Sequence, residues 1–201
     1  LEADKVAGGG VFVHFDNISG KKAEVYVDTE VHNSGKRTRT VAVETVLVDA
    51  GDVPVKRVSQ QVKLQAGESK TVRQRFAVRN PKLWSPDSPY LYRIQSRVKA
   101  GHEVLDGGVT RVGIRKAEFK GKDGFWLNGR PYKEPLIGAN RHQDLAVVGN
   151  AVPNSIHWRD AKKLRDAGMK VIRNAHCPQD PAFMDACDEL GLFVIVNTPG
   201  W

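Results

Sequence analysis

The sequence predicts a mainly β protein that ends in an α/β segment: an immunoglobulin-like β-sandwich followed by three strands of a parallel β/α fold. Two observations carry this prediction. Residues 11 to about 115 alternate apolar and polar side chains with a period of two, which is typical of half-buried antiparallel strands. After residue 116, continuous apolar strands alternate with helical patterns, which is typical of a parallel sheet. We therefore expect one module over residues 1–116 and another over residues 117–201.

The first module contains repeated short strands separated by Gly, Asn or Ser. Each strand carries Val, Ile or aromatic residues on one face and Lys, Arg, Glu or Thr on the other. About seven such strands over about 105 residues match an antiparallel sandwich of immunoglobulin size. The Cys…Trp…Cys pattern of antibody domains is absent from the sequence. The expected strands cover 11–17, 23–33, 40–51, 53–69, 70–80, 90–101 and 109–116.

Three prolines interrupt the sandwich pattern in the stretch "NPKLWSPDSPYLYRI". Proline cannot donate to a strand ladder, so Pro81, Pro86 and Pro89 predict a rigid crossing into the next strand. Trp84 lies within this crossing. It could serve as a ligand platform, but we expect it to plug the end of the sandwich.

The second module begins with an entry hairpin over 117–134, in which "LNGRP" forms the tight turn. The sequence "PLIGANRHQD" then predicts a short buried strand running into a polar loop. A helix follows, capped by Asn154 or Ser155 and ended by Gly168. Its expected apolar stripe consists of Trp158, Ala161, Leu164 and Ala167.

A second strand, "KVIRNAH", leads to a second helix. Asp180 stands at its N-cap and Pro181 at its first helical position, and Gly191 ends it. The apolar residues of this helix are Phe183, Met184, Ala186, Cys187 and Leu190, and "LFVIVNT" is the third strand. Right-handed crossovers place both helices on one face of the sheet. These patterns do not separate an open doubly wound sheet from the beginning of a (β/α)₈ barrel, which takes about 250 residues.

Composition excludes several classes of protein. The net charge is +8 with a pI near 9.6, but the basic residues are spread along the chain, so we expect no nucleic-acid binding. No apolar run is long enough for a membrane span. Cys177 and Cys187 make no disulfide framework or zinc pattern, and we expect both to be reduced and at least partly buried. The first residue is Leu1 and no signal-peptide pattern follows, so the sequence leaves the localisation unknown.

Polar residues collect where the three parallel strands end, which is where β/α folds carry their ligand sites. Two Arg/His pairs at equivalent strand ends favour a hydroxyl-rich or anionic ligand. Retaining glycoside hydrolysis needs two carboxylates about 5–5.5 Å apart. Only Asp144 and Asp180 lie near strand ends, and Asp180 is already explained as a helix N-cap, so the sequence shows no convincing catalytic pair. The candidate positions are Asn140, Arg141, His142, Gln143 and Asp144 after the first strand, Arg173, Asn174, His176 and Gln179 around the second, and Asn197 and Thr198 after the third.

Three stretches together resemble glycoside hydrolase family 2, which includes β-galactosidases, β-glucuronidases and β-mannosidases. They are "LWSPDSPYLYRIQSRV", "FWLNGRPYKEPLIGANRHQD" and "DAKKLRDAGMKVIRNAHCPQDPAFMDACDELGLFVIV". The resemblance covers most of the chain. It implies an immunoglobulin-like β-sandwich followed by the first three β/α strands of a truncated TIM barrel, in a retaining enzyme that acts on terminal β-linked sugars, with β-galactosides as our first expectation.

The family motifs give the site residues. Its N-R-H motif matches Asn140, Arg141 and His142, and its R-x-S-H-Y-P motif matches residues 173–178 with Ala175 and Cys177 in place of Ser and Tyr. The resemblance implies that His142 and His176 bind the sugar and that Arg173 supports the nucleophile region. Asp144 completes the expected binding set.

The resemblance also places the catalytic glutamates on later barrel strands, beyond Trp201, so we expect the isolated chain to be inactive. The third strand lacks the acidic ending of many family members, and we expect neither a metal site nor a cofactor.

Two further expectations concern partners. The exposed apolar edge of three barrel strands predicts packing onto the sandwich, self-association or partial disorder. A non-catalytic immunoglobulin-like module that binds carbohydrate or protein is the alternative to the enzyme.

Overall fold

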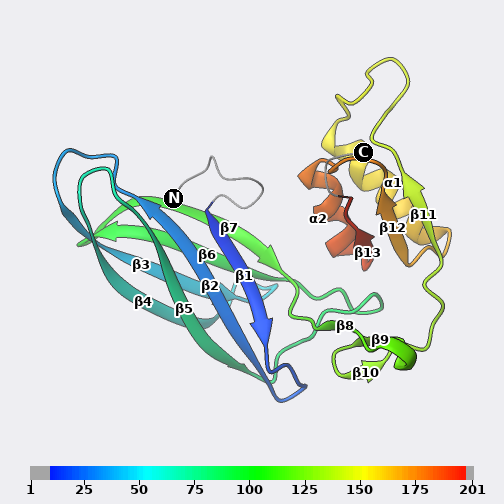
Figure 1. The fold of residues 1–201 in the computed structure, drawn as a ribbon, viewed down its shortest axis with the longest axis horizontal. Coiled ribbons are helices and arrows are strands. Elements are labelled where there is room, and N and C mark those ends of the chain that lie inside the picture. Colours follow the sequence, from blue (N-terminus) through cyan, green and yellow to red (C-terminus); the bar gives the residue numbers. More distant parts are fainter. Residues whose placement is uncertain (1–9, 198–201) are drawn as a thin grey trace.

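The structure is a computed structural model that describes residues 10–197. Figure 1 shows a β-sandwich with a smaller α/β segment at one end. Thr198, which the sequence placed at the end of the third strand, lies outside the described residues. The elements are β1 (Val11–Asp16), β2 (Lys22–His32), β3 (Arg39–Val48), β4 (Pro54–Leu64), β5 (Ser69–Arg79), β6 (Tyr92–Ala100), β7 (Glu103–Val112), β8 (Ala117–Phe119), a 3₁₀ turn (Gly121–Asp123), β9 (Phe125–Leu127), β10 (Arg130–Pro131), β11 (Gly138–Arg141), α1 (Asn154–Asp166), β12 (Val171–Asn174), α2 (Pro181–Leu190) and β13 (Phe193–Ile195).

The sandwich has the seven strands that the alternation predicted, in two sheets with the orders β1-β2-β5 and β4-β3-β6-β7. All its strand pairs are antiparallel. Alternate residues point inward, so Val25, Val43 and Ile94 are fully buried between the sheets. One polar pair crosses this core: Thr45 Oγ1 donates to Gln74 Oε1 at 2.5 Å, and Gln74 Nε2 donates to the Val43 carbonyl.

The start of β7 differs from the sequence expectation. We expected the last strand to cover residues 109–116. The strand begins at Glu103, with a register shift opposite Val98 and Lys99. A Cβ at Gly107 would lie 2.8 Å from the Ser96 carbonyl, so glycine is required there by close backbone approach rather than by a turn.

The hairpin that leads out of the sandwich forms as predicted. β8, β9 and β10 make a small antiparallel sheet, and Leu127 pairs with Arg130 across a two-residue loop. Both loop residues, Asn128 and Gly129, have positive φ, as the favoured hairpin turn requires.

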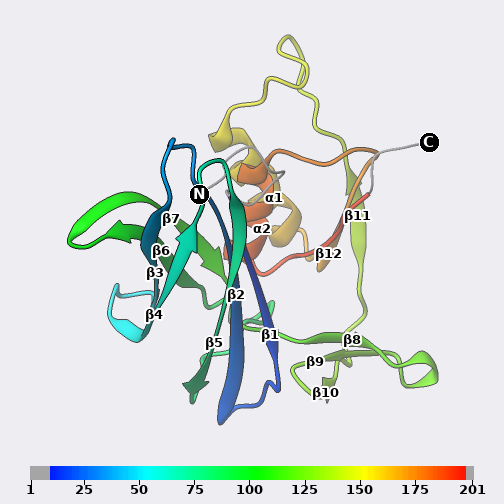
Figure 2. The ribbon, with the colours of Figure 1, turned by 60° about the vertical axis from the view of Figure 1, so that its left-hand side comes forward.

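The α/β segment is a parallel sheet of order β11-β12-β13 with α1 and α2 packed on one face. The two helices lie between the sandwich and these strands (Figure 2). Ala161, Ile172, Phe183 and Leu192 form its core. The prediction of a buried first strand was wrong: β11 is largely exposed, because β12 is its only partner in the described part of the chain.

The ends of the helices and their apolar faces were predicted to different accuracy. Asp180 caps α2 by accepting from the Ala182 N–H at 2.8 Å, and Gly191 ends α2 in the left-handed conformation, as expected. For α1, however, Pro153 occupies the N-cap and no side chain caps the helix. Its expected stripe was half right: Ala161 and Leu164 face the core, whereas Trp158 is 42% exposed, Ala167 is exposed and His157 is fully buried instead.

Trp84 joins the two modules. It is 1% exposed, its Nε1 donates to the Asp188 carbonyl of α2 at 2.8 Å, and its ring meets Phe193 edge-on. Beside it, a Cβ at Gly191 would collide with the Pro86 carbonyl oxygen. Arg111 of β7 adds ion pairs to Asp185 and Glu189. The tryptophan therefore plugs the end of the sandwich, as expected, and also fastens the α/β segment to it.

Candidate functional site

The carboxyl ends of β11 and β12 bring two histidines together. In the parallel register, Asn140 lies opposite Arg173 and Arg141 opposite Asn174. His142 and His176 follow these pairs, and their rings meet edge to face with centroids 5.3 Å apart. Both imidazoles are exposed. Strand ends distant in sequence thus place two hydrogen-bonding rings at one edge of the sheet.

Strand alternation decides which side chains face solvent. In β11, Asn140 is exposed, Arg141 is buried and the following His142 is exposed, as expected for side chains on opposite faces. Arg173, the partner of Asn140, is half-buried, and its Nη1 lies 3.5 Å from Nδ1 of His176. Asn140, His142 and Arg173 therefore belong to the face opposite the helices.

Arg141 points into the interior. Its side chain is 7% exposed and lies over the Phe183 ring, 4.1 Å from the centroid. Nη1 donates to Gln179 Oε1 at 2.5 Å, and Nη2 donates to Asp160 Oδ2 at 3.1 Å. Nη2 also lies 3.0 Å from Nδ1 of His157. The expectation that Arg141 contacts a ligand directly conflicts with this placement, because its guanidinium is committed to the helices.

The contact between Arg141 and His157 has one possible direction. A guanidinium can only donate, so Nδ1 of His157 accepts from Nη2 of Arg141. The sequence analysis missed His157 and Asp160 as part of this network. The signal was available: His157 stands four residues before Ala161 and seven before Leu164, on the buried face of α1.

The loop after β11 is tied to the start of α2 by Gln143. Its Oε1 accepts from the Asp180 N–H at 2.5 Å, and its Nε2 lies 3.4 Å from the Asn150 carbonyl. Asp180 is thereby held twice, once through its backbone and once as the N-cap. On β12, Asn174 is fully buried with its Nδ2 3.4 Å from Met184 Sδ. These contacts hold the backbone on both sides of the two histidines.

The acidic residues near the strand ends have structural roles or lie apart. Asp160 pairs with Arg141, and Asp180 caps α2. Asp144 is exposed in the loop after β11, and Asn197 is half-buried after β13. Within residues 10–197, no group of three or more His, Cys, Asp or Glu side chains is placed to hold a metal ion. The exposed groups at this edge are imidazole, amide and guanidinium, which suit hydrogen bonding to hydroxyl or carboxylate oxygens.

The two cysteines have different environments. Cys187 is buried in the core of the α/β segment, and burial raises the pKa of its thiol to about 12. Cys177 is exposed, contrary to the expectation that both are at least partly buried, because it lies in the loop between β12 and α2.

Neither helix of the described residues has the length and hydropathy that crossing a bilayer would require.

Comparison with known proteins agrees with this architecture. The family model for glycosyl hydrolases family 2 matches residues 10–115, and the model for the TIM barrel domain of the same family matches residues 118–200. A β-galactosidase of Thermoanaerobacter pseudethanolicus is 34% identical over 95% of this chain, which covers 25% of that protein. A β-glucuronidase of Formosa agariphila is 30% identical over 96% of this chain and 20% of its own length.

Solved structures give the same result. A family 2 member from Bacteroides cellulosilyticus superposes with a TM-score of 0.89 at 34% identity, covering 94% of this chain and 26% of that one. A β-glucuronidase from Bacteroides uniformis superposes with a TM-score of 0.86 at 30% identity, covering 93% and 22%. The chain spans about a quarter of the length of these relatives. With its immunoglobulin-like sandwich and the opening strands of a TIM barrel, it belongs to glycosyl hydrolases family 2.

Proposed function

We propose that this chain is part of a retaining β-glycosidase that hydrolyses terminal, non-reducing β-linked sugars, and that its strand ends form one wall of the sugar site. The observation that carries the proposal is the edge-to-face pair of His142 and His176, 5.3 Å apart at the ends of neighbouring parallel strands. Imidazole nitrogens can donate to or accept from sugar hydroxyls. Family membership supports the reaction class.

The residues of the site have different roles in this proposal. His142, His176 and Asn140 contact the sugar, and Asp144 lies at the margin of the site. Arg173 braces His176, from which its Nη1 is 3.5 Å distant. Arg141 is a positioning residue: its buried network with Gln179 and Asp160 fixes the strand end on which His142 stands.

β-Galactosides are the proposed substrates, with β-glucuronides as the second class, since relatives of both names match the chain. The acid/base and nucleophile glutamates are proposed to lie on later barrel strands. Accordingly the 201-residue chain alone should release no sugar from an aryl β-galactoside. Release above background by the purified chain would contradict this part of the proposal.

The deciding experiment uses the enzyme that carries this segment, assayed against a panel of aryl β-glycosides. For the preferred substrate, His142→Ala and His176→Ala should each lower kcat/KM by roughly 10²–10³-fold, because they remove hydrogen bonds to the bound sugar. His102→Ala, an exposed histidine in the β6–β7 turn, is the matched control and should leave kcat/KM unchanged. Unchanged kinetics in both site variants would overturn the proposed sugar site.

We also propose that the isolated chain self-associates through its parallel strands. Ile137, Ile195 and Val196 are 57%, 53% and 55% exposed beside β11 and β13. Burying such apolar side chains between copies is favourable. Sedimentation equilibrium should show a concentration-dependent increase in mass, and a monomer at all concentrations would contradict it.

A further inference from the structure

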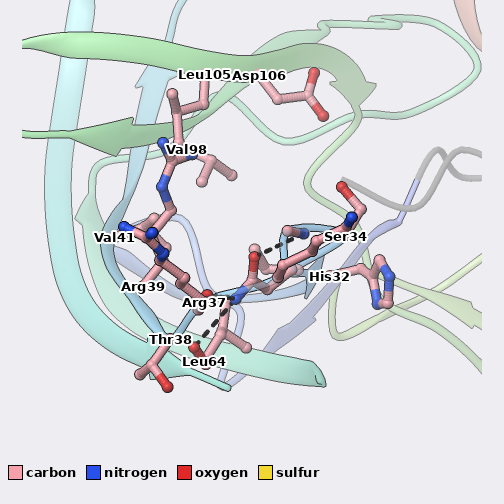
Figure 3. A pocket seen from close by; sticks show the side chains of 14 residues that line it. His32, Ser34, Arg37, Thr38, Arg39, Val41, Leu64, Val98, Leu105 and Asp106 are labelled. Carbon is pink, nitrogen blue, oxygen red and sulfur yellow. Dashed lines mark hydrogen bonds between the residues drawn. The ribbon is translucent and has the colours of Figure 1, made fainter. Parts of the chain in front are cut away.

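A pocket of about 1130 Å³ lies at the end of the sandwich away from α1 and α2. The loop between β2 and β3 forms one side, and the ends of β6 and β7 form the other (Figure 3). It is far along the sandwich from the histidine pair, so it is independent of the proposed sugar site. Its volume is slightly above the roughly 300–1,000 Å³ that is typical of small-molecule sites, which leaves room for an oligomeric ligand.

The floor of this pocket is apolar. Val31, Val41, Leu64 and Val98 line it, and each is at most 4% exposed because the same side chains form the second core of the sandwich. A floor made of core residues does not collapse when the pocket is empty, since the two sheets hold it.

The rim is basic. Lys36 and Arg37 line the pocket from the β2–β3 loop and Arg39 lines it from the start of β3, and all three are exposed. Asp106, on the opposite side, is the single acidic residue in the described part of the pocket lining, and its carboxylate accepts a hydrogen bond from the Gly107 N–H. Over residues 10–197, the three cations form no ion pair, whereas most arginines of the adjoining strands do. Their charge is therefore available to an anion.

The loop that carries two of these cations is held in place by Asn33. This side chain is 7% exposed; its Nδ2 donates to the carbonyls of Arg37, Leu64 and Gln65 at 2.9, 3.2 and 2.9 Å. Its Oδ1 accepts from the Gly35 N–H at 3.1 Å. One buried amide thus links the loop to the end of β4, so the basic rim is ordered before any ligand binds.

We propose that this pocket is a second saccharide-binding site, specific for uronic-acid oligosaccharides. A guanidinium can hold a carboxylate through two parallel hydrogen bonds. Arg37 and Arg39 each supply one guanidinium to the rim of the pocket. The apolar floor accommodates the C–H face of a pyranose ring. Among the described residues that line the pocket none is Phe, Tyr or Trp, and His32 supplies the single ring, which argues against a run of stacked nucleobases. The family acts on glycosides, which favours a saccharide over an acidic peptide.

The test is a titration of the 201-residue chain with a short oligogalacturonate and, separately, with a neutral galacto-oligosaccharide of the same length. Calorimetry measures the affinity, and amide NMR shifts locate the bound ligand. The uronate should bind with shifts concentrated in residues 31–39 and 98–106, and the neutral sugar should bind at least about tenfold more weakly. Shifts concentrated at His142 and His176 instead would assign the binding to the sugar site and overturn this proposal.

Two variants separate the pocket from net charge. Arg37→Gln/Arg39→Gln should weaken uronate binding by about tenfold or more, because two charge-assisted hydrogen bonds are lost. Lys56→Gln/Arg130→Gln changes the net charge equally at exposed positions outside the pocket and should leave affinity almost unchanged. Equal weakening by both pairs would show that binding follows net charge and would refute the pocket.

Thr38→Trp fills the pocket without removing charge and should also abolish binding. All variants should keep the parental melting temperature, since the substituted side chains are exposed. Equal affinity for a single-stranded oligonucleotide would refute the saccharide class.

Discussion

Nη2 of Arg141 lies 3.0 Å from Nδ1 of His157, in a buried contact between the end of β11 and helix α1. The same guanidinium reaches Asp160 and, through Nη1, Gln179 at the start of α2. One side chain therefore holds together the strand that carries His142, the first helix and the turn into the second helix. Arg141 is therefore expected to contribute to the stability of the segment through three separate parts of it.

Arg141→Met should lower the free energy of unfolding of the α/β segment by about 2–3 kcal/mol, because the charge-assisted hydrogen bonds to half-buried Asp160 and to buried Gln179 are lost. Arg159→Met is the matched control: its side chain is 47% exposed and pairs with the same Asp160, so the loss should be within about 0.5 kcal/mol. Urea unfolding and amide exchange in α1 measure both. In the enzyme, Arg141→Lys should lower kcat more than it raises KM if the residue positions His142.

Trp84→Phe should destabilise the seam between the modules by about 1–3 kcal/mol. A smaller aromatic ring replaces the buried indole, and the Asp188 carbonyl loses its donor. Trp126 offers the comparison, since its Nε1 donates to the Asp123 carbonyl at 3.1 Å in a local, half-buried contact. Trp126→Phe should cost less than about 1 kcal/mol. Equal losses by urea denaturation would contradict a special role for Trp84.

Gly191→Ala should cost about 2–4 kcal/mol, because it adds both left-handed strain and a collision with the Pro86 carbonyl. Gly168→Ala separates the two terms: Gly168 has φ +83° and open space around a Cβ. That variant should cost only about 1 kcal/mol. Thermal and urea unfolding of the two variants test the difference, and identical losses would rule out the collision.

Glu24, on the outer face of the β1-β2-β5 sheet, should make the free energy of unfolding fall at acidic pH. Hydrogen bonds from Lys22, Asn17 and Arg75 lower the pKa of this carboxyl from 4.5 to about 2. Because the pKa in the folded state is the lower one, the stabilisation is complete above about pH 4.5 and is lost as the pH falls toward 2. Glu24→Gln and Arg75→Gln should both flatten the dependence of unfolding free energy on pH in this window. An unchanged slope in Glu24→Gln would contradict the assignment.

Periodicity predicted most of the fold because the strands obey it closely. Seven alternating stretches became seven strands, and the Asn128–Gly129 turn, the Asp180 cap and the Gly191 stop were readable from local chemistry. The errors arose where a neighbour overrides local preference. Gly107 lies before the expected last strand but belongs to β7, where it allows a close contact with the Ser96 carbonyl. Trp158 has the hydropathy of a core residue, but the neighbouring His157 takes the buried position.

The candidate site was predictable in position but not in detail. Parallel strand ends converge, so His142 and His176 could be placed together from sequence. The inward direction of Arg141 follows from alternation with Asn140 and His142, once the face of β11 that meets the helices is known. That face depends on tertiary packing. The partners Gln179 and His157 are 38 and 16 residues away from Arg141; helical spacing indicates that His157 is buried, but no local pattern pairs either residue with Arg141.

The seam at Trp84 and Gly191 depends on main-chain atoms: the carbonyl of Asp188 receives the indole proton, and the carbonyl of Pro86 lies against the glycine. Main-chain oxygens persist whatever side chain each residue carries. The angle between sandwich and barrel can therefore outlast sequence drift. A family 2 structure in which about two-thirds of the aligned residues differ still superposes across both modules with a TM-score of 0.89. Substitution of Asp188 or Pro86 would leave both of these contacting carbonyl oxygens in place.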